Sequence, residues 1–176
     1  LSRHMDDIAL MRAAMMKNAV PREFGSHGEV LRVGVCRTFN WDQAAPEAVT
    51  ALESAADTLS RAGAEVNDVE LPAVFDGIEE SFRIISSTEG RNAIAHELES
   101  HFDKLNLWIQ EGAAAGSGWA DGEYEEALAH AAACRTSLRA LFASRDVLLS
   151  PSTTGEAPDD LVGNSNAAFN RTWTLM

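Results

Sequence analysis

The chain has 176 residues, of which 45% are hydrophobic and 23% charged, and its 27 acidic and 14 basic side chains give a net charge of -13. This length suits one globular domain or most of one. The acidic excess repels nucleic-acid phosphates and anionic lipids, so we expect no nucleic-acid partner and no membrane partner. The apolar runs fall far short of the ~20 residues that cross a bilayer. Two cysteines, Cys36 and Cys134, form no paired metal-binding motif, and we expect buried thiols in a reducing cytoplasm.

The first part of the chain predicts a helix followed by a strand, a second helix and a second strand. An amphipathic helix is expected over residues 5–16. The β-branched run at 31–35 predicts a strand, and the spacing of apolar residues over 46–63 predicts a helix. Alternation over 64–71 predicts a second strand, so residues 31–71 should form a right-handed βαβ unit with parallel strands.

The middle of the chain, residues 73–118, predicts a helical insertion on the substrate side. Its composition favours two helices or one kinked helix over 75–101, because a Ser-Ser-Thr run and a glycine weaken the centre. Another short helix is expected around 105–109. The Gly-Ala-Ser-rich stretch over 112–118 is typical of a flexible connector.

Residues 119–150 predict a long helix that leads directly into a strand. Apolar residues recur from Tyr124 to Leu141 with a helical period, and Asp121 is a plausible N-cap. The short apolar core of 146–150 predicts a buried parallel strand. A loop should follow, with a short helix near its end over 167–175.

Most local patterns that could carry chemistry have a simpler explanation. His96 and His101 are five residues apart, about 500° around a helix, so they should face different ways and bind no metal together. Ser117 lies between two glycines in the connector and not in a strand-to-helix turn. The lysines, Lys17 and Lys104, are expected on solvated helix faces.

The loop after the last predicted strand offers a more informative pattern. Residues 150–158 place several hydroxyl groups between two prolines, after the carboxyl end of a parallel strand. Ligands of open α/β sheets tend to bind at such ends. A proline-capped surface turn explains the same residues equally simply, so both interpretations stay open at this point.

Five segments in order along the chain resemble the amidase signature family. The first looks like the helix that follows the family's catalytic core, and the others resemble its LRIGV strand, its AGAEV…LP element, its DVLLTPT strand and loop, and its FNRLWTLL segment. They are residues 1–11, 31–35, 62–72, 146–153 and 169–175. The resemblance implies an α/β fold with a mixed sheet and flanking helices, of which residues 1–176 would be a partial, C-terminal fragment.

The resemblance also implies a serine hydrolase that cleaves carboxamides through an acyl-enzyme, with a small-molecule amide as substrate and with no metal or cofactor. The family triad of a serine, a serine on a cis peptide and a lysine lies upstream of the position of Leu1. No residue of this chain therefore inherits a catalytic role, and we expect the chain alone to be inactive. A homodimer is possible. The expected substrate-binding residues are Ser150, Ser152, Thr153, Thr154 and Trp173.

A different class of protein stays open as the alternative. The same segments could belong to a non-catalytic α/β binding or interaction module that shares only ancestry with the enzymes. The coding sequence upstream of Leu1 separates the two readings. A lysine followed by a Gly-Ser-rich stretch favours the enzyme, and a start codon close to Leu1 favours the module.

Overall fold

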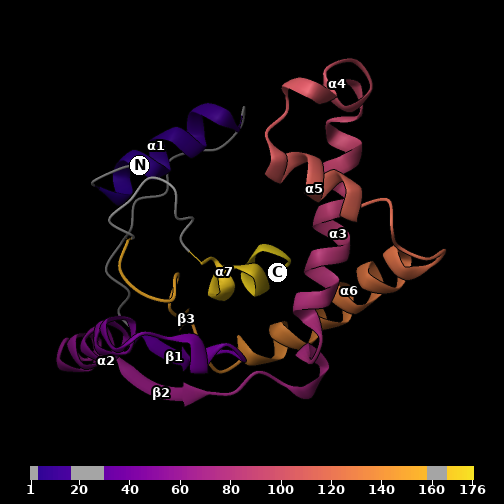
Figure 1. Ribbon diagram of the computed structural model, residues 1–176. Helices are drawn as coiled ribbons and strands as arrows, with labels where there is room; N and C mark the ends of the chain where they lie inside the picture. Colours follow the sequence, from indigo (N-terminus) through magenta and orange to yellow (C-terminus); the bar gives the residue numbers. More distant parts are fainter. Residues whose placement is uncertain (1–3, 17–29, 158–165) are drawn as a thin grey trace. The chain divides into compact units, whose positions relative to one another are not determined.

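The computed structural model describes residues 4–16, 30–157 and 166–176, and the contacts divide the chain into two units, residues 1–30 and 31–176 (Figure 1). The first unit contains helix α1 (Met5–Met15), which confirms the helix expected there. No residue of α1 is buried. The second unit holds all the other elements and is described below by itself.

A parallel strand–helix–strand unit opens the second unit, as predicted. Strand β1 (Arg32–Cys36) leads to α2 (Pro46–Arg61), and α2 leads to β2 (Glu65–Val69), which pairs parallel to β1. Proline occupies the first turn of α2, where its missing N–H costs no hydrogen bond. Helix α2 packs against β2.

A third strand completes the sheet on the other side of β1. Strand β3 (Val147–Leu149) pairs parallel to β1, and the strand order is β2-β1-β3. The prediction of a buried strand is wrong for β3, because it is an outer strand of the described sheet and Val147 is 41% exposed. The chain thus leaves β1 towards one side and returns on the other, so the carboxyl ends of β1 and β3 lie at a topological switch point.

Over residues 75–101, where we expect two helices or one kinked helix, the structure has two helices. They are α3 (Ile78–Ala93) and α4 (Ala95–Ser100), and the break falls at Ile94 and not at the predicted weak centre. Helix α5 (Leu107–Ala115) runs into the stretch that we expected to be a connector. The Asn106 side chain caps α5 by accepting the Ile109 N–H, and alanines continue the helix.

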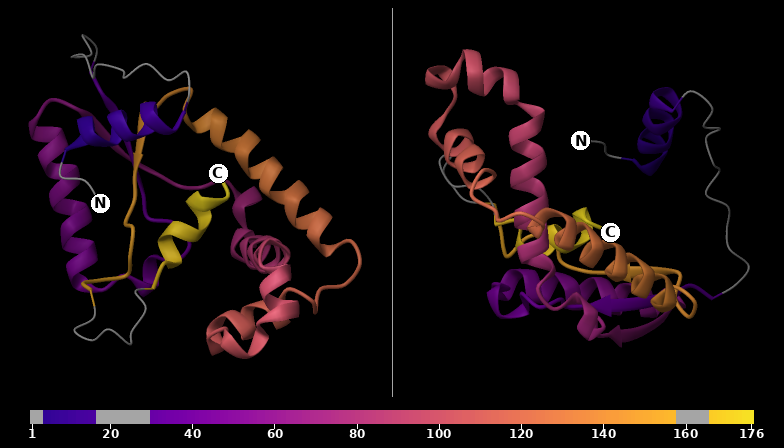
Figure 2. Two further views of the ribbon diagram at one scale, coloured as in Figure 1. Left: turned by 90° about the horizontal axis from the view of Figure 1, so that it is seen from above. Right: turned by 90° about the vertical axis from the view of Figure 1, so that its right-hand side faces the viewer.

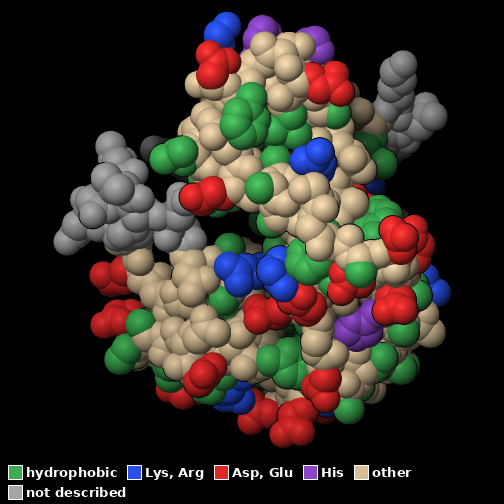
Figure 3. Space-filling model, turned by 45° about the vertical axis from the view of Figure 1, so that its right-hand side comes forward, with side chains coloured by type: hydrophobic (Ala, Val, Ile, Leu, Met, Phe, Trp, Pro, Cys, Tyr) green, Lys and Arg blue, Asp and Glu red, His purple; other side chains and the backbone are tan. Residues whose placement is uncertain are grey.

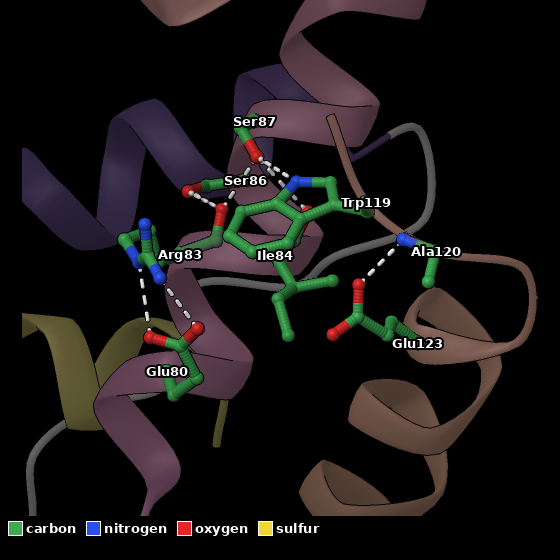
Figure 4. Close-up of polar contacts among 8 residues, drawn as sticks. All are labelled: Glu80, Arg83, Ile84, Ser86, Ser87, Trp119, Ala120 and Glu123. Carbon is green, nitrogen blue, oxygen red and sulfur yellow. Dashed lines mark hydrogen bonds and ion pairs between the residues drawn. The ribbon is translucent and has the colours of Figure 1, made fainter. Parts of the chain in front are cut away.

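The long predicted helix is α6 (Glu123–Leu141). Its N-cap is Gly122, with φ 91°, and not Asp121, because the chain enters the helix through a left-handed conformation that glycine adopts easily. The Glu123 carboxylate accepts the Ala120 N–H at 2.6 Å and so satisfies a backbone donor before the helix (Figure 4). Short 3-10 helices at Trp41–Gln43, Ala73–Phe75 and Phe102–Lys104 complete the connections.

The core of this unit lies where α3 packs against α6. Its buried side chains come mainly from these two helices, and partly buried apolar residues surround them. The buried set is Phe75, Ile78, Ile84, Ile85, Ala127, Ala131, Cys134 and Leu175. Trp119, just before α6, is held on α3 because its indole N–H donates to Ser87 Oγ at 2.8 Å and the Arg83 guanidinium lies 4.7 Å from its ring centroid (Figure 4).

The short helix expected near the end of the chain is α7 (Ala168–Thr174), which packs against α3 (Figure 2). Phe169 and Thr172 are fully buried, so α7 is part of the packed interior of this unit. Among the described helices, none has the length and apolar character to cross a bilayer. Acidic side chains are spread widely over the face drawn in Figure 3, in keeping with the charge of -13.

Candidate substrate-binding site

Two loops meet at the carboxyl ends of β1 and β3. The loop after β1 ends at Ala45, and its backbone N–H donates to the Thr154 carbonyl, in the loop after β3, at 2.7 Å. Gly155 allows this approach, because a Cβ there would lie 3.1 Å from the Ala45 Cβ. The Thr154 main chain therefore fixes the loop after β3 against the start of α2.

A cavity of about 410 Å³ lies between α2 and the loop after β3. Three of the predicted site residues, Ser150, Ser152 and Thr153, line it together. The opposite wall is made of apolar side chains of α2, and two carboxylates also contribute to the lining. These residues are Ala48, Ala51, Leu52, Ala55, Glu47 and Glu156. Hydroxyl groups opposite an apolar wall can orient a small polar group while the wall excludes water from its apolar part.

Trp173 contacts the same loop from α7. Its indole N–H donates to Ser150 Oγ at 3.2 Å. Ser150, Ser152 and Trp173 line a second cavity of about 460 Å³, so the two serines lie between both cavities. Thr154 is the exception among the predicted residues: it lines neither of these cavities and contributes a backbone carbonyl to the loop contact.

A chain of side-chain amides supports the loops, and sequence reasoning missed it. Asn40, which is 5% exposed, donates to Glu79 Oε1 at 2.7 Å and accepts from Gln43 Nε2 at 2.9 Å. The Asn166 Nδ2 group donates to Gln43 Oε1, and the Asn166 carbonyl accepts from Thr153 Oγ1, both at 3.4 Å. This network joins α3, both loops and the start of α7. Asn40 looks like an ordinary turn residue in sequence, so no local pattern could have identified it.

The end of β1 carries two unusual groups close to these loops. Thr38 has φ 59°, which is rare for a β-branched residue and costs of order 1–3 kcal/mol. Burial raises the pKa of the Cys36 thiol, and a hydrogen bond from the Thr38 backbone offsets part of this rise. Cys36 is therefore a protonated thiol at neutral pH and not an activated nucleophile.

The remaining sequence candidates lie elsewhere. The rings of His96 and His101 approach edge to face, with centroids 6.1 Å apart, so the prediction that they face different ways is wrong, because His101 (φ -141°) has left the helix. No group of three potential metal-ligating side chains occurs among the described residues. Ser117 donates to the Ala114 carbonyl at the end of α5, Lys104 lies in an exposed 3-10 turn, and Lys17 lies outside the described residues.

One serine–histidine pair was not anticipated from the sequence. Ser81 Oγ lies 2.7 Å from His130 Nδ1, and His130 Nε2 lies 2.7 Å from the Val74 carbonyl. A carbonyl only accepts, so Nε2 carries a proton, and in the neutral imidazole Nδ1 is then the acceptor for the Ser81 hydroxyl. Ser81 is buried on α3 and His130 is on α6, so the pair ties these two helices together.

Comparisons with known proteins give one consistent family. The family model described as Amidase matches residues 3–166. None of the curated proteins matches this chain. Among solved structures, one described as an amidase is 23% identical, with a TM-score of 0.76 over 89% of this chain and 35% of that chain.

Two further solved structures show the same fold at lower TM-scores. A chain from a structure described as an unexpected vestigial protein complex that reveals the evolutionary origins of an s-triazine catabolic enzyme is 24% identical, with a TM-score of 0.63 over 81% of this chain and 31% of its own. A 6-aminohexanoate cyclic dimer hydrolase complexed with substrate is 18% identical, with a TM-score of 0.69 over 99% of this chain and 43% of its own. The chain therefore spans between 31% and 43% of the length of these three structures.

Proposed function

The chain belongs to the amidase family, and on this premise we propose that it is part of a serine hydrolase that cleaves carboxamide C–N bonds through an acyl-enzyme. The substrate would be a small-molecule amide. The observation that carries this proposal is the cavity at the switch point of the parallel sheet, which Ser150, Ser152 and Thr153 line together.

In this proposal the cavity holds one side of the substrate. The Ser152 hydroxyl can donate to an amide carbonyl. The Ser150 and Thr153 hydroxyls, which donate to the Pro151 and Asn166 carbonyls at 3.4 Å, can accept from an amide N–H, and the alanines of α2 can hold an apolar acyl or amine group. The Trp173 indole orients Ser150, because its N–H occupies one lone pair of Ser150 Oγ and directs the hydroxyl proton elsewhere. Trp173 is thus a positioning residue.

We assign no catalytic residue within residues 1–176. The family's serine, cis-serine and lysine would be supplied by the part of the amidase fold that this chain does not span, in keeping with its coverage of 35% of the solved amidase. The 176 residues alone would then be an inactive fragment. A cytoplasmic location and a homodimer are further parts of the proposal, and they rest on the free thiols and the family resemblance.

The test compares hydrolysis of simple carboxamides by residues 1–176 and by the whole reading frame that contains them. The chain alone should release no ammonia or amine. In the whole reading frame, Ser150→Ala and Ser152→Ala should raise KM, by about tenfold for each lost hydrogen bond of roughly 1.4 kcal/mol. Ser144→Ala, which removes a hydroxyl before β3 and outside the cavity, is the matched control and should leave KM unchanged.

Two results would contradict the proposal. Turnover by residues 1–176 alone, above all if it survives the double change of Ser150 and Ser152 to alanine, would mean that the catalytic groups are within this chain. A reading frame that lacks a lysine and a Gly-Ser-rich stretch upstream of Leu1 would favour the non-catalytic binding module instead.

A further inference from the structure

The charged side chains that line the cavity between α2 and the loop after β3 are all of one sign. They are Glu47, in the first turn of α2, and Glu156, in the loop. Among the described residues, no lysine, arginine or histidine lines this cavity. The cavity therefore presents a negative potential to a ligand, in a protein whose net charge is already -13.

Neither of these carboxylates is neutralised by the protein. Within the part of the chain that the structure describes, Glu47 and Glu156 form no ion pair and no side-chain hydrogen bond, whereas Asp68, Glu80 and Asp146 each pair with an arginine. Glu47 has a structural explanation, because a carboxylate in the first turn of a helix interacts favourably with the helix dipole. Glu156 lies outside the helices and strands, so this explanation does not apply to it.

The α2 wall of the cavity continues from the charged end as an apolar surface. The lining residues of α2 run from Glu47 to Ala55, a rise of about 12 Å at ~1.5 Å per residue, and all those after Glu47 are alanine or leucine. A hydrocarbon stem with a cationic head binds well to such a surface, because the stem packs on apolar side chains while the head stays among polar groups. The cavity volume of about 410 Å³ is sufficient for a small molecule of this kind.

We propose that the substrate amide carries an ammonium group on a short hydrocarbon stem, and that Glu47 and Glu156 select for this positive charge. The inference rests on the proposed function, because it assigns a class of substrate to the same cavity. Both glutamates are exposed, so each contributes weakly as a single ion pair. Their charges act together with those of the acidic protein, which attracts cations and repels anions, so anionic amides are the class most strongly disfavoured.

The first test measures hydrolysis by the protein that the whole reading frame encodes. The substrates are linear primary amides of equal length that end in an ammonium, a methyl or a carboxylate group. At low salt, kcat/KM should decrease in that order, with the ammonium form about fivefold ahead of the methyl form. Glu47→Gln and Glu156→Gln should each reduce this preference by about twofold.

Glu53→Gln is the matched control for the loss of a glutamate from this region. It removes the same charge from α2, but Glu53 lines a different cavity, of about 210 Å³. The preference for the ammonium form should therefore stay unchanged in this variant. Circular dichroism verifies that all three variants fold.

The second test measures binding without hydrolysis, which separates this inference from the proposed function. Pentylammonium and pentanol have similar length and contain no amide bond. In an NMR titration of the unchanged protein, pentylammonium should bind about fivefold more tightly than pentanol, and the difference should shrink in high salt. If the double change of Glu47 and Glu156 to glutamine abolishes this difference while no amide is hydrolysed, the charge selection is supported and only the proposed function fails.

Three results would overturn the inference. Equal kcat/KM for the three amides would remove the charge selection and leave the proposed function intact. A preference that Glu53→Gln reduces as much as Glu156→Gln would arise from the net charge of the protein and not from the cavity. Equal binding of pentylammonium and pentanol would mean that the cavity does not select a cation, and this comparison needs no variant.

Discussion

Gly34 in β1 and Leu148 in β3 lie so close that a Cβ on Gly34 would be 2.8 Å from Leu148 Cδ2. The same Cβ would lie 2.7 Å from both Arg145 Cδ and Val69 Cγ2. Side chains from both neighbouring strands therefore close over the central strand at this position. Glycine is needed here for space and not for an unusual backbone conformation, since its strand geometry is regular.

Gly34→Ala should accordingly destabilise the second unit by about 1–3 kcal/mol, the usual cost of overpacking a filled site. Gly90→Ala is the matched control, because Gly90 lies within α3 and nothing approaches within 4 Å of its Cβ position. That change should stabilise the protein by about 0.5–1 kcal/mol through helix propensity. Urea unfolding followed by circular dichroism measures both, and a destabilisation of equal size in the two variants would contradict this packing.

Arg32 and Asp146 form an ion pair that joins the start of β1 to the start of β3. The Arg32 backbone N–H donates to Asp146 Oδ2 at 2.8 Å, and its Nη2 donates to Oδ1 at 2.7 Å. Asp146→Asn keeps the shape but removes the charge, so we expect a loss of about 1 kcal/mol that shrinks in high salt. Glu80→Gln in the more exposed Glu80–Arg83 pair should cost less than about 0.5 kcal/mol. Equal losses at low and high salt would rule out an ionic contribution.

The sequence predicts the local elements well because their signals are local. Proline at the start of α2 and the alternation in β2 lie within single segments, and the structure confirms both elements. The predictions fail for residues whose burial or hydrogen bonding depends on segments far away in the sequence. The apolar run of β3 predicts a buried strand, yet the order of the strands places β3 at the outside of the described sheet. Asn40 reads as a turn residue, yet its partners Glu79 and Ala168 come from α3 and α7. The candidate site is predicted only in part. Its hydroxyls come directly after a strand, which the sequence shows, whereas the amide network that supports the loops depends on contacts between distant segments.

Cys36 should make the protein less stable at alkaline pH. Burial raises the pKa of its thiol above the ordinary value of 9.0, so the folded state holds the proton after the unfolded state has released it. This stabilisation is complete below pH 9.0 and is lost as pH rises through the folded pKa. The free energy of unfolding should fall as the pH rises from 9.0 through the folded pKa, and Cys36→Ala should reduce this fall. A thiol reagent should label Cys36 slowly at neutral pH until urea unfolds the chain.

Asn40 should be the most sensitive polar residue near the site, because its amide is buried and joins three segments. Asn40→Ala leaves Glu79 and the Ala168 carbonyl without this donor and should cost about 1–3 kcal/mol. Asn40→Asp should cost more at pH 8, because two carboxylates would then face each other. The mutual repulsion raises the pKa of one of them, so the stability of this variant should recover as pH falls and that carboxylate becomes protonated.

Asn67→Ala is the control for the loss of an amide, since Asn67 is exposed and its side chain donates to the Glu65 carboxylate two residues away, at 3.1 Å. It should change the free energy of unfolding by no more than about 0.5 kcal/mol. Urea titrations at pH 5 and pH 8 measure all three variants. If Asn40→Asp were as stable as the parent at pH 8, or lost stability towards pH 5, the 2.7 Å contact with Glu79 could not be the one that holds the loops together.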